Sequence, residues 1–396
     1  GSSNNSLFIV FGILGAMLVG LGIVLILAHN WDELSKGTKT FFAFLPLLIG
    51  QGLCGYVLMK RQNEVAWREG TTTFLFFAVG VSISLVGQIY HIPGNLGAFL
   101  LTWMLLCLPL IYVMNSSVAS LLYLIGITWY AGEISYWTFP QSDSYWYWLL
   151  LPAALPYYFK CSRKYPQSNF TIFHNWIIPA TVAITLGTLA KEVEELMMVA
   201  YMSLFGLFYL IGEQGYFRQQ KLIANGFKVI GSLGTVGLLL ILSFNWYWKE
   251  LRAWDFQLAE IVLLPEMISA VALSLLAGFL LSNMIQRKSL DKIKPMAFVF
   301  LLFILAFILG MSTSFVVVLI NLLVFGIGHM TMKEGARLNH LGILNYGLLV
   351  IAALVVCRFF DTGLSFVIRG IMFVLVGAGF FAANYWMLKK RRLDEK

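Results

Sequence analysis

Residues 96–114 read LGAFLLTWMLLCLPLIYVM and contain no charged side chain. The hydrocarbon core of a membrane is about 30 Å thick, so one helical crossing needs about 20 apolar residues, which this stretch nearly provides. Similar runs fill the chain of 396 residues, which is 59% hydrophobic and only 12% charged, whereas about a quarter of the residues of a soluble protein are charged. The sequence therefore predicts an all-α polytopic membrane protein.

Apolar runs bounded by charges, Pro, Gly and Asn predict about fourteen crossings. The sixth and eleventh runs are short, and the seventh holds few strongly apolar residues. The expected crossings are 7–28, 40–59, 71–89, 96–114, 117–136, 145–159, 174–190, 196–212, 222–246, 260–283, 295–310, 313–332, 340–357 and 364–388.

The basic residues are distributed unevenly between the predicted loops. Nineteen of the 27 Lys and Arg residues fall in the termini and the even-numbered loops, six fall in the odd-numbered loops, and only Lys228 and Arg369 lie inside crossings. Because Lys and Arg concentrate in cytoplasmic loops, both termini are expected to be cytoplasmic. The net charge of +8 then belongs to the inner face, where membrane lipids are the expected partners, and it requires no nucleic-acid partner.

Two similar segments indicate an internal duplication. Residues 22–31 (GIVLILAHNW) align without gaps with residues 237–246 (GLLLILSFNW), and each is followed by a crossing with a proline near its start, Pro46 or Pro265. The alternative is chance similarity between Leu-rich helices. Parallel repeats are common in transporters, whose binding sites lie between the repeats. A duplication predicts a parallel 6+2+6 arrangement of helices. It consists of a first six-helix half at 7–173, two connecting helices at 174–221 and a second six-helix half at 222–388. A tail at 1–6, which is expected to begin with the remnant of a cleaved expression tag, precedes the first half, and a basic cytoplasmic tail at 389–396 follows the second.

Charged side chains inside a membrane are costly and therefore mark candidate functional sites. Arg369 lies within the last crossing, and Arg358 and Asp361 lie in the loop before it. Arg369 could hold an anionic headgroup or a carboxylate through its guanidinium fork. It could equally snorkel to the interface or pair with Asp361, and both interpretations remain open.

Two carboxylates lie near the predicted outer ends of crossings. Glu266 follows Pro265 in the first turn of its helix, where the helix dipole and the free amides favour a negative charge, so capping is its main interpretation. For Glu133, a proton or cation site is the functional alternative to a structural role.

The ends of the first and third crossings supply further candidates. Gln88, Tyr90 and His91 precede a Pro-Gly pair, which predicts a helix stop and a turn, and His29 and Asn30 end the first crossing. These side chains could instead line an outer vestibule together with the carboxylate of the fifth crossing, where histidine would titrate near neutral pH.

No metal-ligand spacing, phosphate-binding glycine loop, nucleophile motif or Cys-x-x-Cys pair occurs in the sequence. We therefore expect no cofactor and no metal. Enzyme activity is disfavoured, although an intramembrane active site needs no local motif.

Six short motifs are spread over most of the chain. They are Asn30-Trp31, Trp67-Arg68-Glu69-Gly70, Gln88-Ile89-Tyr90-His91, Lys333-Glu334-Gly335-Ala336-Arg337, Arg358-Phe359-Phe360-Asp361 and Arg369-Gly370. In this order they resemble a family of bacterial predicted integral membrane proteins that is known only as a domain of unknown function. The resemblance implies a location in the bacterial inner membrane and no established activity.

These observations favour a transporter- or flippase-like protein that binds a small polar or amphipathic molecule between two helical halves. The molecule could be anionic or a lipid. One alternative is a non-transporting structural or regulatory membrane component, which a bundle packed shut would favour. The other is an intramembrane enzyme that acts on a lipid-linked substrate, which an outer cleft with Arg369 facing a carboxylate would favour.

Overall fold

The computed structural model describes residues 34–138, 144–253, 261–287 and 293–360, together with short stretches within 8–22 and 365–385. These residues form helices joined by turns, with no strand among them, which confirms the predicted all-α class. His29, Asn30, Asp361 and Arg369 lie outside the described residues, as do residues 23–31 of the first repeat segment. The chain divides into two compact units, residues 1–189 and residues 190–396.

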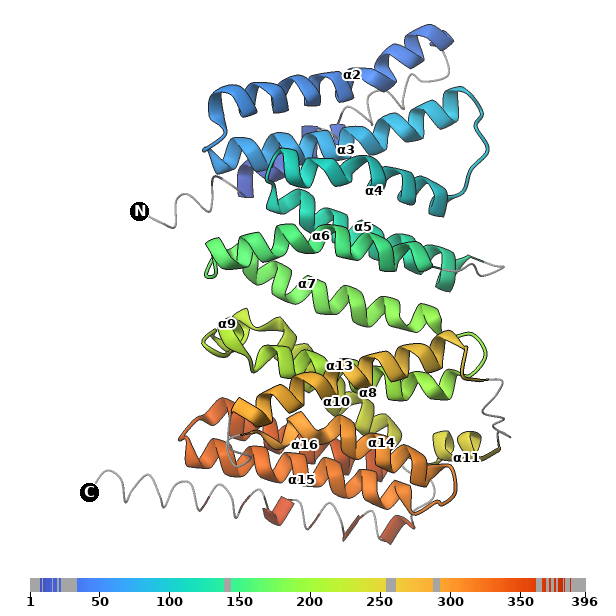
Figure 1. Ribbon diagram of the computed structural model, residues 1–396, viewed down its shortest axis with the longest axis vertical. Helices are drawn as coiled ribbons and strands as arrows, with labels where there is room; N and C mark the ends of the chain where they lie inside the picture. The colour runs from blue at the N-terminus through green and yellow to red at the C-terminus, as the bar shows by residue number, and fades with distance from the viewer. Residues whose placement is uncertain are drawn as a thin grey trace, which may run out of the picture. The chain divides into compact units, whose positions relative to one another are not determined.

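The helices of the first unit follow one another in alternating directions (Figure 1). Helix α5 lies at the centre of its second half and packs against α4, α6 and α7. The elements are α2 (Lys36–Tyr56), the π-helix η2 (Val57–Arg61), α3 (Val65–Ile89), α4 (Leu96–Val113), α5 (Ser117–Gly132), the π-helix η3 (Glu133–Trp137), α6 (Tyr145–Lys164), α7 (Asn169–Leu186) and the 3-10 turn η4 (Gly187–Leu189).

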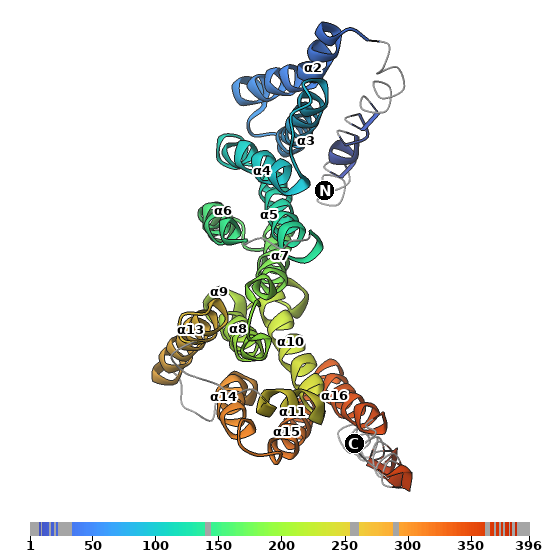
Figure 2. The ribbon, with the colours of Figure 1, turned by 90° about the vertical axis from the view of Figure 1, so that its right-hand side faces the viewer.

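In the second unit, helix α8 packs against α10, α13 and α14, and α15 packs against α16 (Figure 2). The elements are η5 (Glu194–Leu196), α8 (Met197–Gly212), α9 (Gly215–Arg218), η6 (Leu222–Ala224), α10 (Gly226–Leu242), α11 (Asn245–Ala253), α13 (Pro265–Arg287), η8 (Pro295–Phe298), α14 (Val299–Gly310), α15 (Val316–Arg337) and α16 (Leu341–Phe359).

Within the described ranges, nine helices are long and apolar enough to cross a membrane. The pair α10–α11, which is bent by 73°, would be a tenth, and residues 295–310 form a shorter apolar helix. The protein is therefore a multi-pass membrane protein, as predicted. Every expected crossing between residues 40 and 357 coincides with a helix. The total of fourteen crossings and the parallel repeat stay predictions.

Polar residues in the turns set where several helices begin. The side chains of Ser35, Asn95, Ser116 and Ser168 each accept a hydrogen bond from the backbone amide three residues later. Such N-caps satisfy amides that have no partner within the helix. The local sequence thus fixes the helix starts, while the apolar composition fixes the helix lengths.

Buried polar contacts join α5, α6 and α7 in the first unit. The Ser120 hydroxyl lies 2.9 Å from Nε2 of His174, and the Tyr158 hydroxyl donates to Oδ1 of Asn175 at 2.8 Å. Farther along, Thr181 bonds to both Thr128 and Tyr147. Hydrogen bonds of this kind help to hold membrane helices together, and here they link α5, α6 and α7 through buried polar side chains.

Candidate functional site

The candidate site begins where α8 ends and α10 begins. The Asn225 side chain caps α10 through the Lys228 amide, at 3.1 Å, which places Lys228 in the first turn of that helix. A cation is unfavourable there because the helix dipole is positive at this end. Glu213, at the C-cap of α8, offsets this effect, since its Oε1 lies 2.6 Å from the Lys228 Nζ.

A second lysine extends this ion pair into a network. Lys294, at the start of η8, lies 3.1 Å from Oε1 of Glu334 on α15 and 4.0 Å from Oε1 of Glu213. The side chains of both carboxylates are mostly shielded from solvent, at 11% exposed for Glu213 and 23% for Glu334. Two lysines and two glutamates therefore connect α8, α10, η8 and α15 at one end of the second unit.

Three further cations lie beside this network. Arg218, Lys333 and Arg337 line the same cavity, are exposed, and make no ion pair with another described residue. Of the described residues that line the cavity, Glu334 is the one with an acidic side chain. The network is internally neutral, so among the described residues these three cations leave an excess of about three positive charges at pH 7.

The cavity measures about 960 Å³, which is at the upper end of the usual range for small-molecule sites. Arg218, Lys333 and Arg337 form the charged rim of this cavity. Beyond the rim the wall is apolar and includes Val229, Leu233, Ile327 and Met330. Leu233 follows Lys228 by five residues, so it lies about 7 Å deeper along α10.

Two side chains of this apolar wall are exposed. Leu233 and Met330 are both 52% exposed although each lies within an apolar helix, whereas Ile327 is 6% exposed. The Ser232 and Tyr346 hydroxyls, which also line the cavity, lie 2.9 Å apart. The cavity thus offers cations to an anionic group at its rim, and exposed apolar side chains to an apolar segment of the same ligand.

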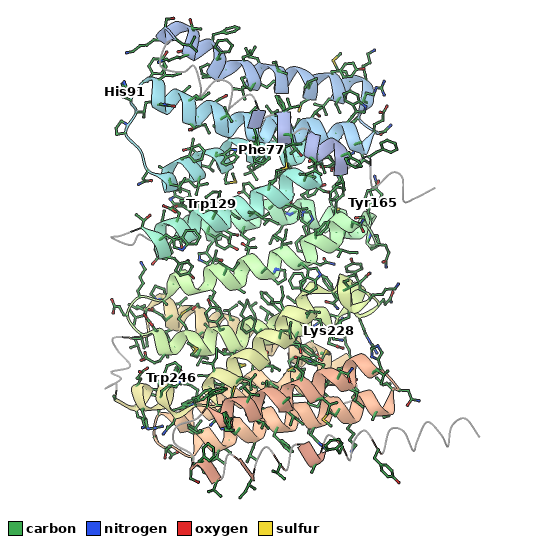
Figure 3. All side chains as sticks on the ribbon, turned by 180° about the vertical axis from the view of Figure 1, so that it is seen from behind. Phe77, His91, Trp129, Tyr165, Lys228 and Trp246 are labelled. Carbon is green, nitrogen blue, oxygen red and sulfur yellow. The ribbon has the colours of Figure 1, made fainter. Side chains whose placement is uncertain are left out.

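Lys228 lies in the first turn of α10, and Trp246 lies just beyond the other end of α10, in the first turn of α11 (Figure 3). At the Trp246 end, where α10 breaks at Ser243, lies Arg358, one of the predicted site residues. It is 7% exposed, its Nη2 donates to the Ser243 Oγ at 2.9 Å, and its guanidinium lies 4.6 Å from the ring centre of Phe244. A cation at a helix C-terminus is favourable, so Arg358 stabilises the break.

The two candidate carboxylates have different local partners. Glu266 is fully buried, and its Oε1 accepts hydrogen bonds from the amides of Lys191, Glu192 and Val193, at 2.6, 2.8 and 3.3 Å. It therefore caps the turn before η5 rather than its own helix. Glu133 begins η3 and accepts a hydrogen bond from the Thr138 hydroxyl at 3.0 Å.

Gln88, Tyr90 and His91 lie at the C-terminal end of α3 and are exposed. The Tyr90 hydroxyl lies 3.1 Å from that of Thr40, and His91 has a positive φ of 54° in the expected turn. Figure 3 shows His91 and Tyr165 at opposite ends of the first unit. A vestibule formed by these residues with His29 and Glu133 stays a prediction.

A buried carboxylate that was not among the candidate site residues, although the motif Trp67-Arg68-Glu69-Gly70 contains it, lies at the other end of α3. Glu69 is fully buried, and it accepts hydrogen bonds from the Ser116 hydroxyl at 2.5 Å, the Ser117 amide at 3.2 Å and the Val118 amide at 3.0 Å. It caps α5 as Glu266 caps the turn before η5. Backbone amides bind each carboxylate, at Oε1 alone in Glu266, and this geometry gives both a capping role.

Sequence reasoning missed the basic rim as a site because its residues lie on two helices far apart in the chain, Arg218 on α9 and Lys333 and Arg337 on α15. The available signal was the concentration of Lys and Arg in the even-numbered loops, and the motif Lys333-Glu334-Gly335-Ala336-Arg337 contains two of the three rim cations. Among the described residues, no group of three or more His, Cys, Asp or Glu side chains could hold a metal ion.

Residues 1–120 match a protein family described as "Predicted membrane protein (DUF2157)". The match confirms the expected resemblance to membrane proteins of unknown function for this part of the chain. No curated protein and no solved structure matches the sequence.

Proposed function

We propose that the protein is a transporter- or flippase-like membrane protein that binds an anionic amphipathic molecule in the basic cavity of its second unit. The observation that carries this proposal is one cavity that combines three cations without an ion pair to another described residue with the exposed apolar side chains of Leu233 and Met330. Basic pockets between membrane helices on the cytoplasmic side suit anionic lipid headgroups. The distribution of Lys and Arg predicts that this end of the unit is cytoplasmic.

The two kinds of surface in the cavity, a charged rim and an apolar wall, also support an amphipathic ligand. A soluble anion would use the rim alone and leave the apolar wall in contact with lipid. A ligand with a charged head and a short apolar segment would use both surfaces.

Binding is tested with the purified protein in nanodiscs of zwitterionic phosphatidylcholine, to which phosphatidylglycerol is added and counted by native mass spectrometry. The double variant Lys333→Gln/Arg337→Gln removes two of the exposed rim cations. We expect its affinity for the anionic lipid to fall about tenfold or more, since a hydrogen bond to a charged group contributes about 1.5–3 kcal/mol. Unchanged affinity would refute the site.

The matched control is Lys36→Gln/Lys249→Gln, which removes two exposed cations away from the cavity and should leave the affinity unchanged. Movement is tested in proteoliposomes that contain a fluorescent anionic lipid, by the rate at which the label changes leaflet. Binding without movement would refute the transport part of the proposal and favour the non-transporting structural or regulatory alternative.

A further inference from the structure

The charge of the cavity is informative about the head of its ligand. Glu213 and Glu334 neutralise Lys228 and Lys294 through contacts of 2.6 and 3.1 Å. Arg218, Lys333 and Arg337 remain exposed at the rim. A ligand that matches the site must therefore bring about three negative charges within a small volume.

We propose that the ligand carries a diphosphate head on an apolar chain. This inference rests on the proposed function and specifies the substrate class of the same site. A phosphodiester lipid carries one negative charge and would leave most of the rim uncompensated. A phosphate monoester carries about 1.5 to 2 negative charges at pH 7, and a second phosphate group brings the head to about three.

The types of side chain at the rim agree with a phosphate head. Arg218 and Arg337 can each bind two phosphate oxygens through a planar guanidinium fork. Lys333 supplies a compact charge one helical turn before Arg337 on α15. The two arginines come from different helices, α9 and α15, so the two phosphates of one head could each take a guanidinium.

The apolar wall favours a diphosphate attached to an apolar chain over a free diphosphate as the ligand. Met330 precedes Lys333 by three residues and Arg337 by seven residues on α15, so it lies about 4.5 Å and about 10 Å from these two rim cations along the helix. It is 52% exposed, like Leu233 on the facing helix α10. A chain attached to the head would cover both side chains.

The first experiment compares four probes with the full-length protein in phosphatidylcholine nanodiscs: farnesyl diphosphate, farnesyl monophosphate, phosphatidylglycerol and inorganic diphosphate. We expect farnesyl diphosphate to bind at least about tenfold more tightly than each of the others. Equal affinity for farnesyl diphosphate and phosphatidylglycerol would overturn the inference and leave the proposed function standing. Equal affinity for inorganic diphosphate would overturn the need for a chain, and binding of none of the four would overturn the proposed function as well.

The second experiment uses a change that should increase affinity. Glu334→Gln removes an acid from the cavity and releases Lys294 for the ligand, so farnesyl diphosphate should bind several-fold more tightly. A merely structural role for Glu334 would weaken binding instead, and that result would overturn the inference. Glu250→Gln, an exposed change on α11, is the matched control and should not alter affinity. Thermal unfolding without ligand identifies any variant that has not folded.

Discussion

Removing the carboxylate of Glu213 should destabilise the second unit, because Lys228 would lose its partner in the first turn of α10. The two charged atoms lie 2.6 Å apart, and the side chains are 11% and 25% exposed. Breaking a fully buried pair from one side costs about 3–5 kcal/mol. Since Lys228 retains some access to water, we expect Glu213→Gln to cost about 2 kcal/mol, to which the 4.0 Å contact with Lys294 adds at most about 0.5 kcal/mol.

A double-mutant cycle isolates the pair from other effects of the substitutions. The free energy of unfolding is measured by titration with a denaturing detergent for the wild type, Glu213→Gln, Lys228→Met and the double variant. We expect a coupling energy of about 1–2 kcal/mol, with the double variant more stable than Glu213→Gln alone. A coupling energy below about 0.5 kcal/mol would refute the reasoning, because the pair would then behave like a solvated surface contact.

Three further substitutions test the packing and the polar contacts of the second unit by the same unfolding measurement. Gly231→Leu should cost about 3 kcal/mol, since a Cβ there would lie 2.5 Å from a backbone nitrogen of α8. A Cβ at Gly237 would meet nothing within 4 Å, so Gly237→Leu should be nearly neutral. Ser243→Ala should cost about 1–2 kcal/mol, because buried Arg358 loses a hydrogen bond of 2.9 Å. Glu266→Gln should cost about 2 kcal/mol, because three amides lose a charged acceptor.

Matched controls accompany the two polar substitutions. Ser282→Ala removes a hydroxyl that bonds only within its own helix, to the Phe279 carbonyl, and should have little effect. Glu133→Gln removes a partly exposed carboxylate and should cost less than Glu266→Gln. If either control costs as much as its counterpart, the stabilising role assigned to the buried contact would be wrong.

The positions of the helices follow from local sequence, which explains why every expected crossing between residues 40 and 357 coincides with a helix. The break between α10 and α11 could not be predicted in the same way. Ser243, Phe244 and Asn245 include neither Pro nor Gly. The break is stabilised from elsewhere, since the Ser243 carbonyl accepts from Asn321 at 3.1 Å and its hydroxyl from Arg358.

The candidate site could not be predicted from local sequence either. Lys228 was visible as a charge inside a crossing, but its partner Glu213 belongs to the preceding helix and lies across a turn. The sequence predicts that Arg218, Lys294 and Arg337 share one side of the membrane. It does not predict that they surround one cavity, because the packing of the helices decides which loops are neighbours.

The uncompensated charge of the rim distinguishes ligand binding from a purely structural role. Like charges within one cavity repel each other, and at physiological ionic strength screening acts over about 8 Å. A structural cluster gains stability when each cation has an anion, as Lys228 and Lys294 do. Arg218, Lys333 and Arg337 gain none from the described residues, so a bound anion would relieve the repulsion between them. The exposed apolar side chains of Leu233 and Met330 in the same cavity favour an anion that is attached to an apolar chain.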